Sequence, residues 1–160
     1  MTDEIRENVR NILTDYLQKH GRRKTPERYA ILDTIYSSDG HFDIDSLYKS
    51  MAEGKRFRVS RATLYNSIML FINAGLVLKH QFGNTSQYER AYNNETHHHT
   101  ICTSCGKVTE FEDPYLQRAI TNAKVRNFTA SHYSLYIYGM CSACKRKLTK
   151  KKTKQQIKER

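Results

Sequence analysis

Two C-x2-C pairs constrain this chain more than any other feature of its sequence. Cys102 and Cys105 form the first pair, and Cys141 and Cys144 form the second after 35 intervening residues. Four thiolates complete a tetrahedral zinc site, with Zn–S bonds of ~2.3 Å. Two disulfides or four free thiols are the alternatives. Because a cytosolic chain keeps its thiols reduced and a two-residue spacer suits chelation of one ion, we predict a structural Zn(II) site.

A run of three histidines, His97, His98 and His99, comes just before the first cysteine pair. If this segment is extended, alternation places His97 and His99 on one face and His98 on the other. Two imidazoles on one face supply half of a second metal site, and its remaining ligands must come from elsewhere in the chain. A solvated histidine run is the alternative, but such tags occur at chain ends, whereas this run lies beside the cysteines.

Length and hydropathy limit the classes of protein to consider. The 160 residues fit one domain or two small ones. The first ten residues are charged and have no apolar segment of the kind that directs secretion. The most apolar run, residues 68–78, is interrupted by Asn73 and Gly75, so it is too short to cross a membrane. We therefore expect a cytoplasmic protein with no membrane partner.

The net charge of +11 favours a polyanionic partner, but it is unevenly distributed. Residues 145–160 contain nine Lys or Arg and one Glu, a net charge of +8, which leaves +3 for the first 144 residues. Residues 149–160 are therefore predicted to be a basic, disordered tail, since like charges with little apolar surface cannot support packing.

The first half of the chain has the pattern of four helices followed by a hairpin. Apolar residues recur at helical spacing over residues 2–20, and Gly21 ends that helix. Thr25, Asp43 and Ser60 are placed to cap the next three helices. Strands are expected over residues 76–82 and 86–91. This order predicts a winged-helix DNA-binding domain over residues 1–91, in which the last helix enters the major groove.

The outer face of the fourth helix carries four residues suited to DNA contact: Arg61, Thr63, Tyr65 and Asn66. A solvated surface is the alternative interpretation, although a capped helix that presents Tyr and Arg outward fits it less well.

The second half changes character and is predicted to be a small α/β dimerisation domain over residues 92–148. Residues 100–111 and 128–138 are typical of strands, and Asp113-Pro114 opens a helix expected to reach Asn127. Residues 134–138 are apolar on both faces, as in a strand that is covered on both sides. So small a sheet buries little, so zinc and dimerisation are expected to stabilise it. The fold class predicted for the whole chain is α+β.

Several motifs, in this order and spacing, resemble the Fur family of metal-dependent transcriptional regulators. They run from residue 21 to residue 144 and are Gly21-Arg22-Arg23-Lys24-Thr25 with Arg28 and Ile31-Leu32; His41 with Leu47-Tyr48; Ala62-Thr63-Leu64-Tyr65; Ala74-Gly75-Leu76-Val77; Tyr88-Glu89; residues 97–107; Glu110-Phe111; and residues 134–139 before Cys141.

The resemblance implies two metal sites. The four cysteines match the structural zinc site of the family. A regulatory site between the two domains is implied for five further residues: His41, Glu89, His97, His99 and Glu110. Imidazoles and carboxylates suit Fe(II), Zn(II) or Mn(II), so ligand type alone does not select the metal. Taken singly, His41 is equally consistent with a loop histidine and Glu89 with a solvated carboxylate.

Two departures from the family pattern, and one comparison with its peroxide sensors, affect this interpretation. The segment between Glu89 and Cys102 is one residue longer than in common members. A third metal site of some members falls on Thr96, His98, Gln117 and Tyr133, of which only His98 is a good ligand, so we expect that site to be absent. Peroxide sensors of the family tend to carry Asp where Glu89 and Glu110 stand, which argues mildly against peroxide sensing.

The resemblance also implies roles in DNA binding. Tyr65 matches a family tyrosine whose ring reaches thymine methyl groups in the major groove. Asn66 stands where the family usually has Arg, and Asn favours adenine edges. Arg23 corresponds to a basic residue that enters the minor groove, where narrow A·T-rich segments attract cations.

The function implied is that of a non-enzymatic repressor of metal homeostasis genes, most simply of iron uptake, which binds operator DNA as a metal-loaded homodimer. A zinc- or peroxide-responsive member of the same family is the nearest alternative. A metallohydrolase that uses the His/Glu cluster is the alternative from another class, but the chain has no H-E-x-x-H motif.

Overall fold

The computed structural model of the chain describes residues 2–38, 40–53, 59–82, 85–92, 97–130 and 132–149. The chain divides into two compact units, Met1–Asn94 and Glu95–Arg160. Of the tail predicted over residues 149–160, only Thr149 is among the described residues, and it is helical, as are residues 142–148. Among the described residues, no helix is long and apolar enough to cross a membrane.

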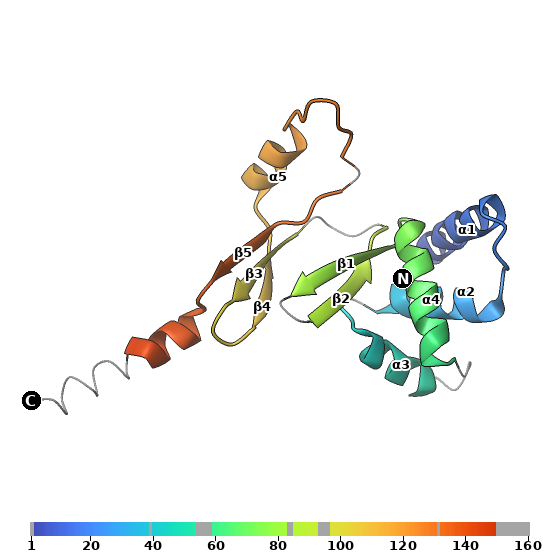
Figure 1. The fold of residues 1–160 in the computed structure, drawn as a ribbon, viewed down its shortest axis with the longest axis horizontal. Coiled ribbons are helices and arrows are strands. Elements are labelled where there is room, and N and C mark those ends of the chain that lie inside the picture. The colour runs from blue at the N-terminus through green and yellow to red at the C-terminus, as the bar shows by residue number, and fades with distance from the viewer. Residues whose placement is uncertain are drawn as a thin grey trace, which may run out of the picture. The chain divides into compact units, whose positions relative to one another are not determined.

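The N-terminal unit is a winged helix, with four helices followed by a two-stranded hairpin (Figure 1). The helices are α1 (Asp3–Lys19), α2 (Pro26–Ser37), α3 (Ile44–Glu53) and α4 (Arg61–Asn73). The strands β1 (Val77–Phe82) and β2 (Thr85–Arg90) pair antiparallel, with Val77 opposite Arg90 and Phe82 opposite Thr85.

Side chains cap three of these helices, and two of these caps, Asp43 and Ser60, were predicted from the sequence. The Thr2 hydroxyl accepts a hydrogen bond from the Ile5 amide at 3.4 Å, and the Ser60 hydroxyl accepts one from the Thr63 amide at 3.0 Å. Asp43 accepts a hydrogen bond from the Ser46 amide at 2.7 Å. The prediction for Thr25 was wrong in one respect, because its side chain makes no capping hydrogen bond. Pro26 at the first helical position has no N–H and a fixed φ, so it starts α2 without such a cap.

The core of the N-terminal unit lies between the four helices and the start of the hairpin. Leu13, Ile31, Leu64, Phe71 and Leu76 are each 0% exposed. After α4 the chain turns sharply into β1 at Gly75, whose φ of +69° is accessible to glycine without strain.

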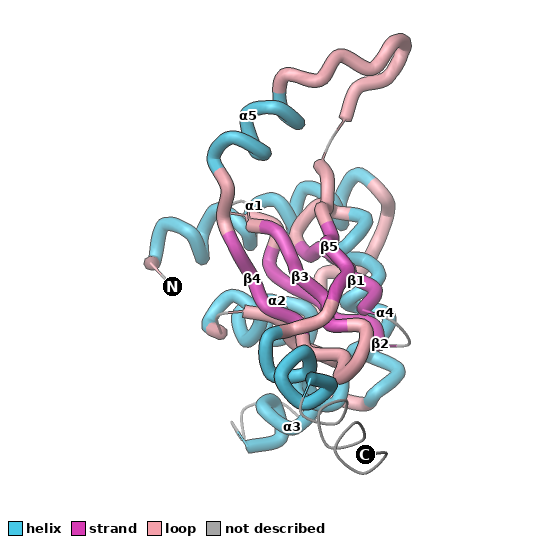
Figure 2. The backbone as a smooth tube through the Cα atoms, turned by 90° about the vertical axis from the view of Figure 1, so that its left-hand side faces the viewer, coloured by secondary structure: helices cyan, strands magenta, loops and turns pink. Residues whose placement is uncertain are grey.

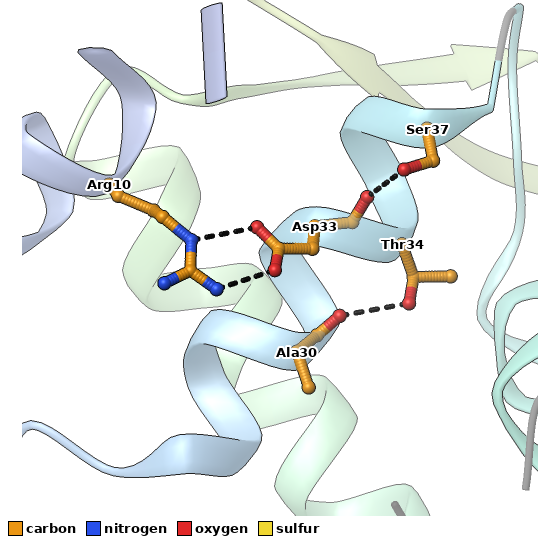
Figure 3. Close-up of polar contacts among 5 residues, drawn as sticks. All are labelled: Arg10, Ala30, Asp33, Thr34 and Ser37. Atoms are coloured by element: carbon orange, nitrogen blue, oxygen red, sulfur yellow. Dashed lines mark hydrogen bonds and ion pairs between the residues drawn. The ribbon is translucent and has the colours of Figure 1, made fainter. Parts of the chain in front are cut away.

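Polar contacts join α1 to α2 at the edge of this core. The Arg10 guanidinium donates two hydrogen bonds to the Asp33 carboxylate, at 3.0 Å and 2.6 Å (Figure 3). On the same helix as Asp33, Tyr36 is buried and its hydroxyl donates to the Leu76 carbonyl at 2.7 Å. The Tyr92 amide donates to that hydroxyl at 3.1 Å. One side chain therefore connects α2 with the residue before β1 and with the segment after β2.

The C-terminal unit is a three-stranded sheet with strand order β4-β3-β5 (Figure 2). Its elements are β3 (His98–Cys102), β4 (Val108–Phe111), α5 (Pro114–Thr121) and β5 (Tyr136–Gly139). The strand β3 pairs antiparallel with β4 and parallel with β5. The predicted strand over residues 100–111 is therefore two strands, because the chain reverses between them at Gly106, whose φ is +73°.

Two further predictions for this unit were wrong. The helix predicted to reach Asn127 ends at Thr121, since Thr121 and Asn122 are poor helix formers and Asn122 caps the helix. The strand predicted over residues 128–138 is formed only at Tyr136–Gly139, where β3 provides a partner of five residues. β5 is also largely exposed in the single chain, with Ile137 at 45% and Tyr138 at 58%.

Candidate metal centres and the DNA-facing helix

The four cysteines converge in the C-terminal unit. Cys102 ends β3, Cys105 lies in the turn that follows, Cys141 follows β5, and Cys144 lies in the helix over residues 142–149. Their four sulfur atoms all lie within 4.8 Å of one another, and none is in a disulfide. The Cys105 and Cys141 sulfurs are 3.9 Å apart. Two Zn–S bonds of ~2.3 Å at a tetrahedral angle place sulfurs ~3.8 Å apart, so the donor set fits a closed zinc site.

Hydrogen bonds shift the pKa values of three of these cysteines, two downwards and one upwards. The Cys141 amide donates a hydrogen bond to the Cys102 sulfur at 3.3 Å, and this bond is the largest of several that lower the pKa of Cys102 to about 6. The Cys144 amide similarly lowers the pKa of Cys141. At Cys105, hydrogen bonds with neighbouring sulfurs outweigh one from the Lys107 amide and raise its pKa to about 11. A cation bound among the sulfurs would stabilise the thiolate form.

A second donor cluster lies on β3 and β4. His99 is opposite Glu110 in the strand register, and the rings of His97 and His99 are 4.9 Å apart. These three residues each offer a donor atom within 4.8 Å of the others. His99 is 2% exposed, His97 is half-buried and Glu110 is exposed. Two imidazoles and a carboxylate are a ligand set for Zn(II), Fe(II) or Mn(II).

The remaining residues predicted for the regulatory site, His41 and Glu89, lie close together in the N-terminal unit. The His41 Nε2 atom is 3.5 Å from Glu89 Oε2. A third residue, His80 of β1, was not predicted, although its Nε2 atom is 2.6 Å from Glu89 Oε1. A signal was present in the sequence. His80 is two residues after Leu78, and Leu78 pairs with Glu89. Because side chains alternate along a strand, His80 and Glu89 lie on the same face of the hairpin.

The sequence predicted that the third metal site of some relatives is absent. That absence stays a prediction. Thr96 is outside the described residues, and Gln117 is exposed. His98 is 1% exposed, with its ring 6.1 Å from that of Tyr133. Within the described part of the chain, neither ring nitrogen of His98 nor the Tyr133 hydroxyl has a hydrogen-bond partner.

The outer face of α4 presents the residues predicted to contact DNA. Tyr65 is 53% exposed, Asn66 is exposed and Thr63 is half-buried. The Thr63 hydroxyl lies 2.9 Å from that of Ser60, the helix cap, so its side chain is partly engaged. Arg23 is also exposed, in the segment between α1 and α2.

The Arg61 side chain contacts other residues of the N-terminal unit. Its guanidinium forms an ion pair with Asp45 of α3 and lies 4.9 Å above the ring of Tyr48. Since the Arg61 side chain remains 57% exposed, it is accessible, but a contact with phosphate would have to replace the one with Asp45.

A winged helix joined to a small sheet with a four-cysteine centre defines a metal-binding, DNA-binding regulator. Comparison with known proteins gives the family: residues 19–138 match the ferric uptake regulator family, and the chain belongs to it. This is a family of metal-responsive transcription regulators. The resemblance found in the sequence is thereby confirmed, and the hydrolase alternative loses its support.

Individual relatives agree with this assignment. The peroxide operon regulator of Bacillus subtilis is 38% identical over 132 residues, which cover 82% of this chain and 90% of that protein. The peroxide-responsive repressor PerR of Staphylococcus epidermidis is 35% identical over 130 residues, covering 81% and 85% respectively. Among solved structures, the ferric uptake regulator of Pseudomonas aeruginosa with manganese superposes with a TM-score of 0.67 at 29% identity, covering 81% of this chain and 97% of that one.

Proposed function

We propose that this chain is a repressor that binds operator DNA as a metal-loaded homodimer. The observation that carries the proposal is that each unit holds a cluster of metal-binding side chains: His41 and Glu89 in the N-terminal unit, and His97, His99 and Glu110 in the C-terminal unit. One regulatory divalent ion bound by all five residues restricts the orientation of the winged helix. Metal and operator then favour the same state, and each strengthens binding of the other.

The proposed role of Zn(II) at the four cysteines is structural. A closed site of four thiolates leaves no open position for a substrate or for exchange of ligands. The zinc joins the turn after β3 to the end of β5, which are far apart in the sequence. Its binding free energy is therefore also folding free energy for this unit.

The proposed homodimer is supported by the exposed apolar surface of the C-terminal unit. β5 is an edge strand of the sheet, and Ile137 and Tyr138 on it are exposed. The helix α5 has no fully buried residue in the single chain. A second copy that covers these elements removes both the unpaired strand edge and the apolar surface from water.

In the proposed complex, α4 lies in the major groove. Tyr65 contacts thymine methyl groups, Asn66 reads adenine edges, and Thr63 contacts the backbone. Arg23 enters the minor groove, and Arg61 exchanges Asp45 for a phosphate. Since a chromosomal operator is the target, we place the protein in the cytoplasm.

We propose iron homeostasis as the signal that the protein serves, with Fe(II) as the first candidate for the regulatory metal and Zn(II) and Mn(II) as alternatives. A peroxide-responsive repressor is the second candidate function, because the named relatives at 38% and 35% identity are peroxide regulators. Glu89 and Glu110 favour the first candidate, since peroxide sensors of the family tend to have Asp at both positions.

The test of the regulatory site is a full-length His97→Ala/His99→Ala variant. Binding to duplexes selected from a random library by the metal-loaded wild type is measured by fluorescence anisotropy with Fe(II), Mn(II) or Zn(II). We expect the variant to keep its structural zinc and lose metal-dependent binding by about 100-fold. The exposed His20→Ala variant serves as the control. Unchanged metal dependence in the double variant would show that the regulatory site lies elsewhere.

The same assay separates the two candidate functions. Fe(II)-loaded and Mn(II)-loaded wild-type protein are exposed to dilute hydrogen peroxide before DNA is added. A peroxide sensor loses DNA binding only when it carries iron, since Fe(II) is readily oxidised by peroxide. A regulator of iron uptake keeps its DNA affinity once fresh Fe(II) is supplied.

A further inference from the structure

The N-terminal unit contains a cluster of two imidazoles and a carboxylate that the five proposed regulatory ligands do not account for. His41, His80 and Glu89 each offer a donor atom, and these three atoms lie within 4.8 Å of one another. His80 Nε2 is 2.6 Å from one Glu89 oxygen, and His41 Nε2 is 3.5 Å from the other. The two imidazole rings meet edge to face, with centroids 5.2 Å apart.

Regular backbone pairing brings these side chains together. His80 and Glu89 are on adjacent strands of the hairpin, offset by two positions on the same face. His41 precedes Phe42, which forms a β-bridge with Tyr88 through two hydrogen bonds of 2.8 Å. Each donor residue is therefore fixed by the backbone of the N-terminal unit itself.

The cluster is almost completely removed from water. The side chains of His80, Glu89 and His41 are 2%, 5% and 10% exposed. Phe82 covers one side, with its ring 5.6 Å from the rings of both histidines. A carboxylate buried in this way needs a positive partner, because an uncompensated charge in an apolar environment is strongly destabilised. The two imidazoles already contact this carboxylate, and a divalent cation held by all three groups would add positive charge beside it.

We propose that His41, His80 and Glu89 form a three-donor divalent metal site contained within the N-terminal unit. Two His and one carboxylate are a ligand set found for Zn(II) and for non-haem Fe(II). The site shares His41 and Glu89 with the proposed regulatory site, but it requires no donor from the C-terminal unit. His80 is then a direct ligand, and the winged helix retains a metal ion through its own residues.

The distances are compatible with a shared ion. Two metal–ligand bonds of ~2.1 Å at a tetrahedral angle separate their donor atoms by ~3.4 Å. The separation of 3.5 Å between His41 and Glu89 already has this value. The shorter contact of His80 with Glu89 is a hydrogen bond, which an ion bound by both side chains would have to replace.

A different role for His80 has to be distinguished from ligation. By hydrogen bonding to Glu89, His80 would act only as a positioning residue for a metal held elsewhere. Loss of such an outer-shell partner costs about 10–100-fold in metal affinity. Loss of one of three direct ligands costs more, and a side chain that restores only the hydrogen bond does not compensate for it.

The experiment uses full-length zinc-loaded protein carrying His97→Ala and His99→Ala, which removes both imidazoles of the C-terminal cluster. Co(II) is titrated and followed by its visible absorption, and bound metal is counted by elemental analysis. We expect one Co(II) per chain beyond the structural zinc, with weak bands typical of nitrogen and oxygen ligands. Adding His80→Leu should weaken this binding by more than 100-fold. Adding His80→Gln, which keeps a hydrogen-bond donor near Glu89, should not restore it.

The matched control is His20→Leu in the same background, an exposed histidine at the end of α1, which should bind Co(II) unchanged. Circular dichroism confirms that each variant is folded, and His80→Gln serves if the leucine variant is not. No Co(II) binding in the double-variant background overturns the proposal. Full rescue by glutamine, or a loss of about 100-fold or less with leucine, also overturns it, because a loss of that size is what an outer-shell positioning residue gives.

These outcomes are independent of the proposed regulatory function. That function is tested by the DNA affinity of the His97→Ala/His99→Ala variant, whereas the three-donor site is tested by Co(II) binding to the same protein. Either proposal can therefore fail while the other holds.

Discussion

The two units of this protein are stabilised in opposite ways. Among the described residues, 20 apolar residues are buried, and 18 of them lie in the N-terminal unit. The C-terminal unit contributes only Ile101 and Cys102, the second of which is a proposed zinc ligand. It exposes a larger set of apolar side chains: Tyr115, Val125, Phe128, Ile137, Tyr138, Met140 and Leu148.

This difference assigns separate physical roles to the two units. The N-terminal unit holds α4 in place by apolar burial, so its DNA-binding surface is formed without a cation at the cysteines. The C-terminal unit buries too little apolar surface to offset its conformational entropy. The proposed zinc and the proposed partner copy would supply the missing stability, so we expect folding of this unit to depend on metal supply.

The largest expected effect comes from breaking the four-cysteine centre. Cys102→Ser should unfold the C-terminal unit, because a structural zinc site contributes ~10–16 kcal/mol of apparent binding free energy to folding. The N-terminal unit should stay folded, so most helical signal in circular dichroism is retained. Sedimentation should show a monomer, and elemental analysis should show no tightly bound zinc.

Ser104→Ala is the matched control, since this residue lies between the first two cysteines and is exposed. It should leave zinc content and oligomeric state unchanged. A folded, zinc-free dimer of Cys102→Ser would contradict the dependence of this unit on zinc.

The converse change removes core volume from the N-terminal unit. Phe71 of α4 is 0% exposed, so Phe71→Ala should lower the free energy of unfolding of this unit by ~3–5 kcal/mol. Zinc release from the C-terminal unit, followed with a chromogenic chelator, should not change. Met69→Ala, on the same helix at 53% exposure, should cost less than ~0.5 kcal/mol. Faster zinc release from the Phe71 variant would show that the two units do not fold independently.

The same contrast explains how much of the fold the sequence predicted. Helices of the N-terminal unit were predicted well because their apolar spacing and caps, such as Ser60 and Asp43, are local signals that the core reinforces. In the C-terminal unit the strand and helix ends were wrong. There α5 ends at Thr121, the chain reverses at Gly106, and β5 is limited by the length of its partner strand. When strands that are distant in sequence pair, no local sequence pattern indicates where the pairing begins and ends.

Predictions of site residues followed a similar division. The cysteine pairs, and His97 with His99, were predicted from spacing alone, because each pair lies within a few residues. His41 and Glu89 required the family resemblance. His80 was missed because a single histidine in an apolar strand has no distinguishing pattern until the hairpin register places it beside Glu89.

The smallest expected effect concerns Tyr36, which connects α2 with the residue before β1 and the segment after β2. Tyr36→Phe keeps the buried ring but leaves the Leu76 carbonyl and the Tyr92 amide without this hydroxyl. Because buried polar groups that lose a partner are destabilised, the free energy of unfolding should fall by ~1–2 kcal/mol at neutral pH. Tyr115→Phe in the C-terminal unit, where the ring is 79% exposed, should have no measurable effect.

The pH dependence tests the same residue. Burial raises the pKa of Tyr36 to about 12 from an ordinary value of 10.0, so the folded state holds this proton more tightly than the unfolded chain does. The stabilisation is complete below pH 10 and is lost as the pH rises towards 12. Urea titrations at pH 8, 10 and 11 should therefore show a steeper loss of stability in the wild type than in Tyr36→Phe. Parallel losses would mean that other groups dominate the alkaline unfolding of the N-terminal unit.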